Sequence, residues 1–306
     1  MNDLQKIEER VKREVALKNY KGEDRIVLAQ TKWEEIKEEL GNKPAFTVSM
    51  GLPKIDDCLK TLGLGRLVVL SGPPKNGKTQ LCQTFTKRFT EQGKKILWFS
   101  YEVGYEELFG KFPMENLDFY VPNYMETGDV DWIEDKIIES KQKYGTNIVF
   151  IDHLDFLRDP NALKGIGLNL SAYVGGIVQK IKRISVEQNM LIFLMSHIRK
   201  NNWTSNKLPA AEELRDSGQI AQLADVVMMI VRKRNKSSNP EEIYLGNEAL
   251  VGVIENRLNG KTKIAQVEFK DGEFSETPFK TPNPYEPKES DKVSDDEWSG
   301  QVDQLL

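Results

Sequence analysis

The chain has 306 residues, 39% of them hydrophobic, with a formal net charge of -4 and a pI of about 5.6. The length and hydrophobic content allow one large α/β domain with a buried core. The net negative charge excludes an overall electrostatic attraction to nucleic acid, so any binding of nucleic acid needs a local basic surface. The two cysteines lack disulfide or zinc-site spacing, the N-terminus is charged, and no run approaches about 18 apolar residues, so we expect a cytoplasmic protein without a signal peptide or membrane span.

Residues 1–45 are predicted to form an N-terminal helical extension, broken near Gly22. Apolar residues recur there at steps of three and four: Leu4, Ile7, Val11, Val15, then Trp33, Ile36 and Leu40. This narrow stripe could dock on the chain's own core or on a neighbouring subunit, and the pattern leaves both readings open. Residues 46–64 then predict a short strand, a turn and a helix.

Residues 65–80, GRLVVLSGPPKNGKTQ, contain the pattern G-x-x-x-x-G-K-[ST] between a predicted buried strand and a predicted helix. In such a loop backbone N–H groups close around phosphate oxygens, the lysine meets the β and γ phosphates, and the hydroxyl ligates Mg²⁺. The candidate nucleotide-binding residues are Gly72, Pro73, Pro74, Lys75, Asn76, Gly77, Lys78, Thr79 and Gln80.

Two further apolar runs lead to acidic residues. Residues 95–100 predict a strand followed by Glu102, which we expect one strand away from the phosphate loop, where a carboxylate can polarise a water. A solvated glutamate is the alternative reading. Residues 147–152 predict a strand that ends at Asp152, the Walker B arrangement, so Asp152 is a candidate Mg²⁺ ligand together with Thr79.

Residues 173–189 predict a helix, and the strand after it leads to His197, a candidate contact for the γ phosphate. Either this residue or His153, the other histidine of the chain, could instead be an ordinary hydrogen-bonded side chain, and for His153 the ordinary reading is favoured. Residues 199–217 form a polar stretch whose basic residues surround one tryptophan, a composition that suits a loop for single strands as well as a solvated surface loop. The candidate DNA-binding residues here are Arg199, Lys200, Trp203, Lys207 and Arg215.

These motifs occur in an informative order: the phosphate loop, Phe99-Ser100-Tyr101-Glu102, Ile151-Asp152-His153-Leu154, Ser196-His197, the stretch 213–225 (ELRDSGQI followed by Ala224-Asp225) and Glu255-Asn256-Arg257-Leu258-Asn259-Gly260. Over residues 46–269 the chain resembles the RecA-type ATPase domain of replicative DNA helicases of the DnaB superfamily. The stretch 213–225 is the most specific part. Ser196-His197 resembles the branch of phage primase-helicases and their mitochondrial relative.

The resemblance implies ATP and Mg²⁺ as cofactors and assigns roles by position. Lys78 would bind the phosphates, Glu102 would activate the attacking water, and His197 would sense the γ phosphate. Arg257 would reach a neighbouring subunit's site as an arginine finger, which implies a homo-oligomer, a hexameric ring by resemblance. Arg215, Asp216 and Gly218 would line a central channel and contact the phosphates of single-stranded DNA.

The chain departs from the family pattern in two places. Glu255 replaces the lysine of the K-x-R motif that contains Arg257, so a second cation in trans must come from elsewhere, with Lys261 and Lys263 as candidates. Residues 1–45 replace the family's collar or primase domain, and no zinc module or acidic primase motif is present in the sequence. The N-terminal helices are therefore candidates for the linker helix that, in this family, packs on the adjacent subunit.

The predicted architecture is an N-terminal helical extension (1–45), a RecA-like P-loop ATPase core with a mostly parallel sheet flanked by helices (46–272), and a disordered proline-rich, acidic tail (273–306). The expected function is a replicative helicase that moves 5′ to 3′ on single-stranded DNA. A RecA-like or RadA-like recombination ATPase and a helicase-loader or accessory ATP-binding module are the alternatives. A primase, polymerase or single-strand-binding protein could dock on the N-terminal helices or the tail.

Overall fold

The computed structural model describes residues 3–22, 25–41, 46–112, 116–126, 129–157, 170–198, 207–209, 217–236 and 243–279. The chain divides into two compact units, residues 1–46 and residues 47–306. None of the helices within the described ranges is long and apolar enough to cross a membrane. The predicted disorder of residues 280–306 lies outside the described ranges.

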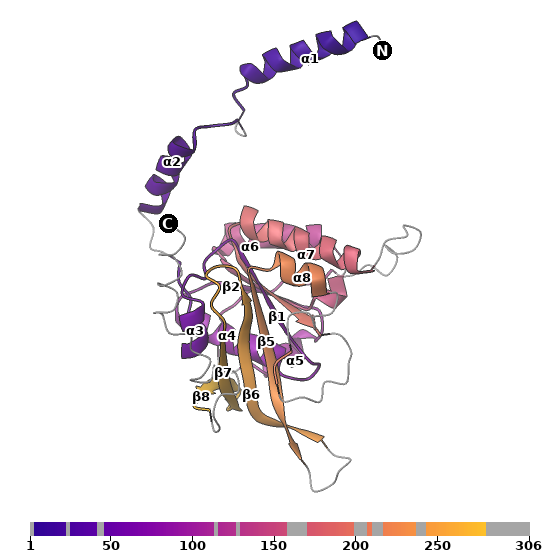
Figure 1. Ribbon diagram of the computed structural model, residues 1–306. Helices are drawn as coiled ribbons and strands as arrows, with labels where there is room; N and C mark the ends of the chain where they lie inside the picture. The colour runs from indigo at the N-terminus through magenta and orange to yellow at the C-terminus, as the bar shows by residue number, and fades with distance from the viewer. Residues whose placement is uncertain are drawn as a thin grey trace, which may run out of the picture. The chain divides into compact units, whose positions relative to one another are not determined.

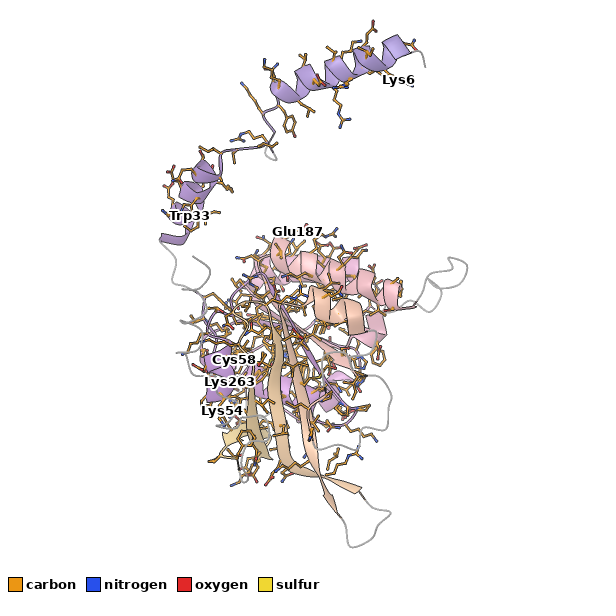
Figure 2. All side chains as sticks on the ribbon, in the orientation of Figure 1. Lys6, Trp33, Lys54, Cys58, Glu187 and Lys263 are labelled. Carbon is orange, nitrogen blue, oxygen red and sulfur yellow. The ribbon has the colours of Figure 1, made fainter. Side chains whose placement is uncertain are left out.

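The first unit contains α1 (Asp3–Lys18) and α2 (Ala29–Gly41), the two helices expected from the spacing of apolar residues. Their apolar side chains are in contact with solvent: Ile7 is 59% exposed and Val11 52%. Trp33 of α2, labelled in Figure 2, is 48% exposed. Among the residues of α1 and α2 whose side chains the structure describes, these apolar side chains are therefore largely in solvent.

The second unit is built on one sheet (Figure 1). Among the described residues its strands follow the spatial order β2 (Ile96–Ser100), β3 (Ile148–Asp152), β4 (Leu191–His197), β1 (Arg66–Gly72), β5 (Val226–Lys236), β6 (Ile243–Asn256), β7 (Lys263–Lys270) and β8 (Glu273–Thr277). The pairs from β2 to β5 are parallel and those from β5 to β8 antiparallel. Four of these seven strand pairs are parallel, so the described sheet is mostly parallel, as expected.

Helices cover both faces of this sheet. The remaining elements are α3 (Pro53–Cys58), α4 (Lys78–Glu91), α5 (Tyr105–Gly110), α6 (Val130–Tyr144), the 3-10 turn η1 (Leu154–Leu157), α7 (Leu170–Glu187) and α8 (Ser217–Leu223). On one face, α6, α7 and α8 pack against alternate residues of the strands, among them Val69 and Ile151. Because side chains alternate along a strand, the intervening residues face the opposite layer, where α4 packs.

An aromatic cluster fills the α4 side of the core. The Phe150 ring stacks between Trp98 and Phe193, with centroids 4.8 Å from each, and Phe89 of α4 lies 5.9 Å from Phe193. All four side chains are fully buried. This cluster packs α4 against β3 and β4.

Three expectations are wrong in detail. Residues 46–50 form no strand, although α3 follows as predicted. The tail does not begin at residue 273, because β8 pairs with β7 and Phe274 is fully buried. Strand β2 is not one strand away from β1, because β3 and β4 lie between them.

Candidate functional site

The phosphate loop lies between β1 and α4. A Cβ atom on Gly72 would lie 2.3 Å from the carbonyl oxygen of Ile230 on β5. Only glycine therefore allows the end of β1 to lie this close to the β5 backbone. Gly77 adopts φ 92°, a left-handed conformation that favours glycine, and α4 begins at the next residue. The loop therefore brings the N-terminus of a long helix, a natural anion site, to the end of β1.

Asn76 anchors this loop. Its side-chain oxygen accepts a hydrogen bond of 2.9 Å from the Arg232 backbone N–H on β5, and its amide donates to the Pro74 carbonyl. Asn76 is 4% exposed, whereas Lys75, at φ 63°, is exposed. The buried Asn76 side chain thus holds the loop against β5, while Lys75 lies at the surface of the loop.

The Lys78 amine occupies the centre of the loop. It donates to the Gly72 and Pro73 carbonyl oxygens, both at 3.2 Å, and lies 2.9 Å from His197 Nδ1. Burial lowers the pKa of Lys78 from 10.5 to about 8, although the nearby Asp152 carboxylate opposes the shift. At neutral pH the amine is therefore protonated and positioned to meet phosphate oxygens.

Thr79 and Asp152 form the candidate Mg²⁺ site. The Thr79 hydroxyl donates a 2.8 Å hydrogen bond to Asp152 Oδ2. Asp152 is fully buried, and its Oδ1 has no hydrogen-bond partner within the described part of the chain. A buried, unpartnered carboxylate oxygen beside a hydroxyl suits a hard cation that prefers oxygen ligands. Burial raises the pKa of Asp152 to about 6, so the carboxylate is mainly ionised at neutral pH.

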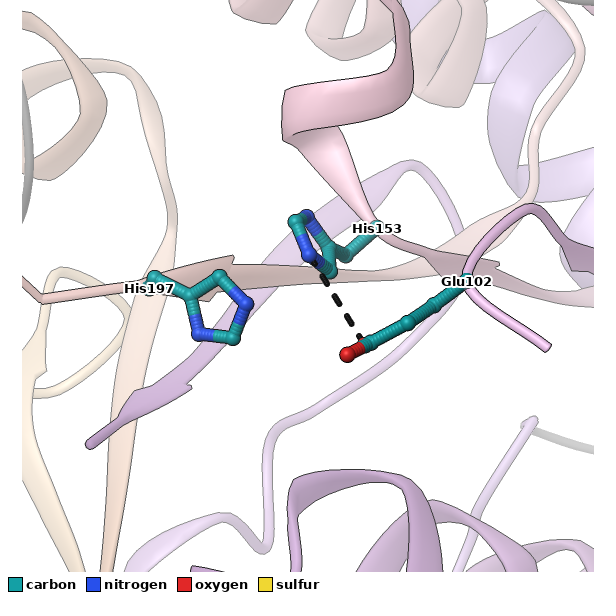
Figure 3. A group of neighbouring side chains, drawn as sticks. All are labelled: Glu102, His153 and His197. Carbon is teal, nitrogen blue, oxygen red and sulfur yellow. Dashed lines mark ion pairs between the residues drawn. The ribbon is translucent and has the colours of Figure 1, made fainter. Parts of the chain in front are cut away.

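Glu102, His153 and His197 lie together at the ends of β2, β3 and β4 (Figure 3). One ligand atom from each lies within 4.8 Å of the others. Glu102 is 41% exposed, and the Glu102 N–H and Tyr101 N–H both point to the Asp152 carbonyl, at 3.3 and 2.6 Å. The candidate base is therefore held by its backbone to the Walker B strand while its carboxylate can reach solvent.

A cavity of about 160 Å³ adjoins these groups, between the phosphate loop and α5. Predicted residues line it: Lys75, Gly77, Lys78, Thr79, Gln80, Glu102 and His197. Gln83, Glu107 and Lys111 line it as well and were not predicted, since nothing in their sequence positions distinguishes them from ordinary helix-surface residues. His153 is a further residue of the site that was interpreted as ordinary.

Arg257 lies away from this cavity. It follows β6, whose Asn256 pairs with Val226, and Val226 pairs with Val68 near the start of β1. The phosphate loop follows the other end of β1, about 13 Å along the strand at 3.3 Å per residue. Arg257 is exposed and its guanidinium donates to the Ala221 carbonyl.

The candidate DNA-binding residues are described only in part. Lys207 is exposed, and Gly218 lies in α8. Arg199, Lys200, Trp203, Arg215 and Asp216 lie outside the described residues. Asp225, at the end of the 213–225 stretch, stabilises the fold. Its carboxylate accepts a hydrogen bond of 2.7 Å from the Leu67 N–H and forms ion pairs with Arg66 and Lys182.

The family model for the DnaB-like helicase C-terminal domain matches residues 113–276, more than half of the chain. The chain belongs to this family. The matched segment contains Asp152, His197 and Arg257 and begins after the phosphate loop, so the loop's assignment stands on its own sequence pattern and geometry.

Curated relatives agree with this membership. A probable plasmid replicative DNA helicase of Chlamydia trachomatis serovar L2 is 32% identical over 121 residues, covering 39% of this chain and 25% of that protein. The replicative DNA helicase DnaB of Leifsonia xyli subsp. xyli is 24% identical over 257 residues, covering 73% and 54%. The chain thus spans between a quarter and about half of the length of these relatives.

Two solved structures share the fold. "The Structure Of A DnaB-Like Replicative Helicase And Its Interactions With Primase" matches with a TM-score of 0.64 at 17% identity, covering 89% of this chain and 71% of that one. The second, the structure of an isolated ATPase domain, matches with a TM-score of 0.63 at 19% identity, covering 81% and 97%. At these identities the likeness shows the fold, which is the RecA-like ATPase fold expected from the sequence.

Proposed function

We propose that this protein is an ATP-dependent replicative DNA helicase that moves along single-stranded DNA and unwinds duplex at a replication fork. One observation carries the proposal: in a member of the DnaB-like family, the ends of β1, β2 and β3 bring Lys78, Thr79, Glu102 and Asp152 to one edge of the sheet. These are the groups that hydrolysis of a nucleoside triphosphate requires. The protein would work in the cytoplasm of the cell that holds the replicating DNA.

The proposed chemistry uses each group where it lies. Loop amides, the α4 N-terminus and Lys78 bind the β and γ phosphates, and the Lys78 amine exchanges its bonds with the Gly72 and Pro73 carbonyls for phosphate oxygens. Thr79 and Asp152 would hold Mg²⁺, which neutralises phosphate charge when bound. Glu102 accepts the proton of the attacking water, and His197 contacts the γ phosphate.

Arg257 acts in trans in this proposal. Arg257 lies about 13 Å along the sheet from the phosphate loop of its own subunit, a separation that supports a role at the site of a neighbouring subunit. This supports a ring of identical subunits, six by family resemblance, moving 5′ to 3′. The exposed apolar stripes of α1 and α2 are proposed contacts for an adjacent subunit or for a primase, polymerase or single-strand-binding protein.

The DNA contacts are proposed for Arg215, Asp216 and Gly218, and further contacts for Arg199, Lys200, Trp203 and Lys207. Arg215→Ala should weaken binding of single-stranded DNA and flatten its dependence on salt by about one unit of slope, because each lost phosphate contact releases one counterion fewer. An unchanged slope, measured by fluorescence anisotropy between low and moderate salt, would place the DNA site elsewhere.

Steady-state ATP hydrolysis with and without single-stranded DNA tests the proposal. We expect DNA to stimulate hydrolysis in the wild-type protein, and Lys78→Ala to remove hydrolysis under both conditions. Nucleotide binding with no hydrolysis would favour an accessory ATP-binding module instead. Stimulated hydrolysis by filaments rather than rings in negative-stain images would favour a recombinase.

A further inference from the structure

His153 is a buried histidine next to the proposed base, and the chemistry described so far gives it no part. Its side chain is 4% exposed, and its ring makes edge-to-face contacts with His197 at 4.2 Å and with Phe156 at 5.1 Å between centroids. His153 Nε2 lies 3.7 Å from Glu102 Oε2 (Figure 3). The ring is therefore fixed by packing, and one of its nitrogens faces the carboxylate.

The other ring nitrogen indicates where the hydrogen lies. His153 Nδ1 accepts a hydrogen bond of 3.1 Å from the Asp155 backbone N–H, so this nitrogen carries a lone pair and no hydrogen. In the neutral imidazole the hydrogen must then be on Nε2, the atom that faces Glu102. His153 Nε2 and Glu102 Oε2 are 3.7 Å apart, so a rotation of the half-exposed Glu102 side chain would be needed to bring its oxygen into hydrogen-bonding range.

His197 also uses its Nδ1 atom as an acceptor. Its Nδ1 lies 2.9 Å from the Lys78 amine, which can only donate while it is protonated, so the neutral His197 ring also carries its hydrogen on Nε2. Two histidines and one carboxylate are a common ligand set for transition metals, but a metal needs an unprotonated ring nitrogen. With both Nδ1 atoms used as acceptors, the hydrogen of His153 lies on the nitrogen that faces Glu102.

We propose that His153 is a positioning residue for Glu102: its Nε2–H donates to the carboxylate and orients the other carboxylate oxygen toward the attacking water. This proposal rests on the proposed hydrolysis of ATP. The edge-to-face contact of the two rings also holds the base and the phosphate-contacting His197 in a fixed relation. Removing the donor should slow the chemical step without weakening nucleotide binding.

Two matched variants test this role. His153→Leu introduces an apolar side chain of similar bulk and removes the hydrogen-bond donor. His153→Gln instead supplies an amide N–H near the position of Nε2. For His153→Leu we expect kcat for ATP to fall by about 10- to 100-fold, the range for a displaced general base, with the Kd for ADP within about twofold of wild type. His153→Gln should recover a large part of kcat.

Ring nitrogen-15 NMR gives a readout that does not depend on activity. The chain has only two histidines, so the spectrum contains two ring systems, and His153→Gln assigns the one that remains. We expect the hydrogen of both rings on Nε2, and addition of Zn²⁺ to leave the His153 signals in place.

Four results would overturn the proposal: a hydrogen on Nδ1 of His153, a kcat for His153→Leu equal to wild type, equal losses in the Leu and Gln variants, or stoichiometric Zn²⁺ binding through Nε2. The helicase proposal fails separately. A wild-type protein that hydrolyses ATP without unwinding DNA would contradict the helicase and leave the His153 comparison intact.

Discussion

The Thr79 hydroxyl donates a 2.8 Å hydrogen bond to Asp152 Oδ2, joining the first turn of α4 to the last residue of β3 across 73 positions of sequence. This bond places the two candidate Mg²⁺ ligands side by side. The unpartnered Asp152 Oδ1 on the same carboxylate completes an oxygen-rich site.

Thr79→Val should therefore separate Mg²⁺ use from nucleotide binding. Valine keeps the shape of threonine but removes the hydroxyl, so we expect hydrolysis to fall by at least about 100-fold, a loss typical of removing one stabilising contact to the reacting group. ADP binding in the presence of a chelator should change little. Thr79→Ser, which keeps the hydroxyl, serves as the control; equal Mg²⁺ titrations of hydrolysis in the Val and Ser variants would refute the assignment.

The low pKa of Lys78 predicts opposite effects of pH on stability and on binding. Between about pH 8 and 10.5 the unfolded chain binds a proton that the folded chain has released, so this group's contribution to the free energy of unfolding rises with pH across that window. Phosphate binding needs the charged amine, so the affinity for ADP should fall above pH 8, by up to about tenfold per pH unit. Binding of a fluorescent ADP analogue from pH 7 to 9.5 measures this.

Lys78→Ala is the control for that titration. It should bind ADP weakly and show no dependence on pH in the same range, because the titrating amine is gone. A wild-type affinity that stays constant to pH 9.5 would mean that the Lys78 amine keeps its ordinary pKa in the loop.

Arg257→Ala should abolish hydrolysis while nucleotide still binds. A finger of this kind contributes about 10³- to 10⁵-fold to turnover. Mixing Arg257→Ala with Lys78→Ala subunits should restore part of the activity, because a boundary between the two variants can pair an intact phosphate loop with an intact Arg257. Hydrolysis measured across mixing ratios gives the answer, and a mixture as inactive as its parts would exclude action in trans.

Asp225→Asn should destabilise the fold. Its carboxylate pairs with Lys182 of α7 at 2.5 Å and with Arg66 at 3.3 Å, and is 11% exposed, so removing its charge leaves two cations without their partner. We expect a loss of about 3 kcal/mol in the free energy of unfolding. Asp131→Asn is matched to it, since Asp131 pairs with Lys180, also of α7, but is 69% exposed, and should cost at most about 1 kcal/mol. Urea denaturation that finds equal stability for both variants would contradict a structural role for Asp225.

Local sequence pattern predicted the parts of the site that follow strand ends. The phosphate loop, Glu102, Asp152 and His197 each follow an apolar run, and parallel strands bring their carboxyl ends to one edge, so proximity could be inferred without the fold. The strand order could not be inferred, because nothing local encodes which strands pair. For that reason the sequence pattern wrongly predicts β2 one strand away from β1, whereas β3 and β4 intervene.

His153 and β8 were missed for related reasons. The environment of His153 depends on contacts with Asp155, His197 and Glu102, two of which come from other strand ends. Strand β8 follows a glycine turn in a polar stretch, and its burial comes from one residue, Phe274, whose ring packs over Gly77 of the phosphate loop. A single buried aromatic gives no periodic signal, so the sequence predicts that the tail begins before β8.

Strand separation of a forked duplex with a 5′ tail, followed by fluorescence under Mg²⁺ and ATP, tests the helicase most directly. We predict unwinding by the wild-type protein that requires the tail and ATP, with none by Lys78→Ala. Hydrolysis of ATP stimulated by single-stranded DNA, with no strand separation on forks of either polarity, would contradict it.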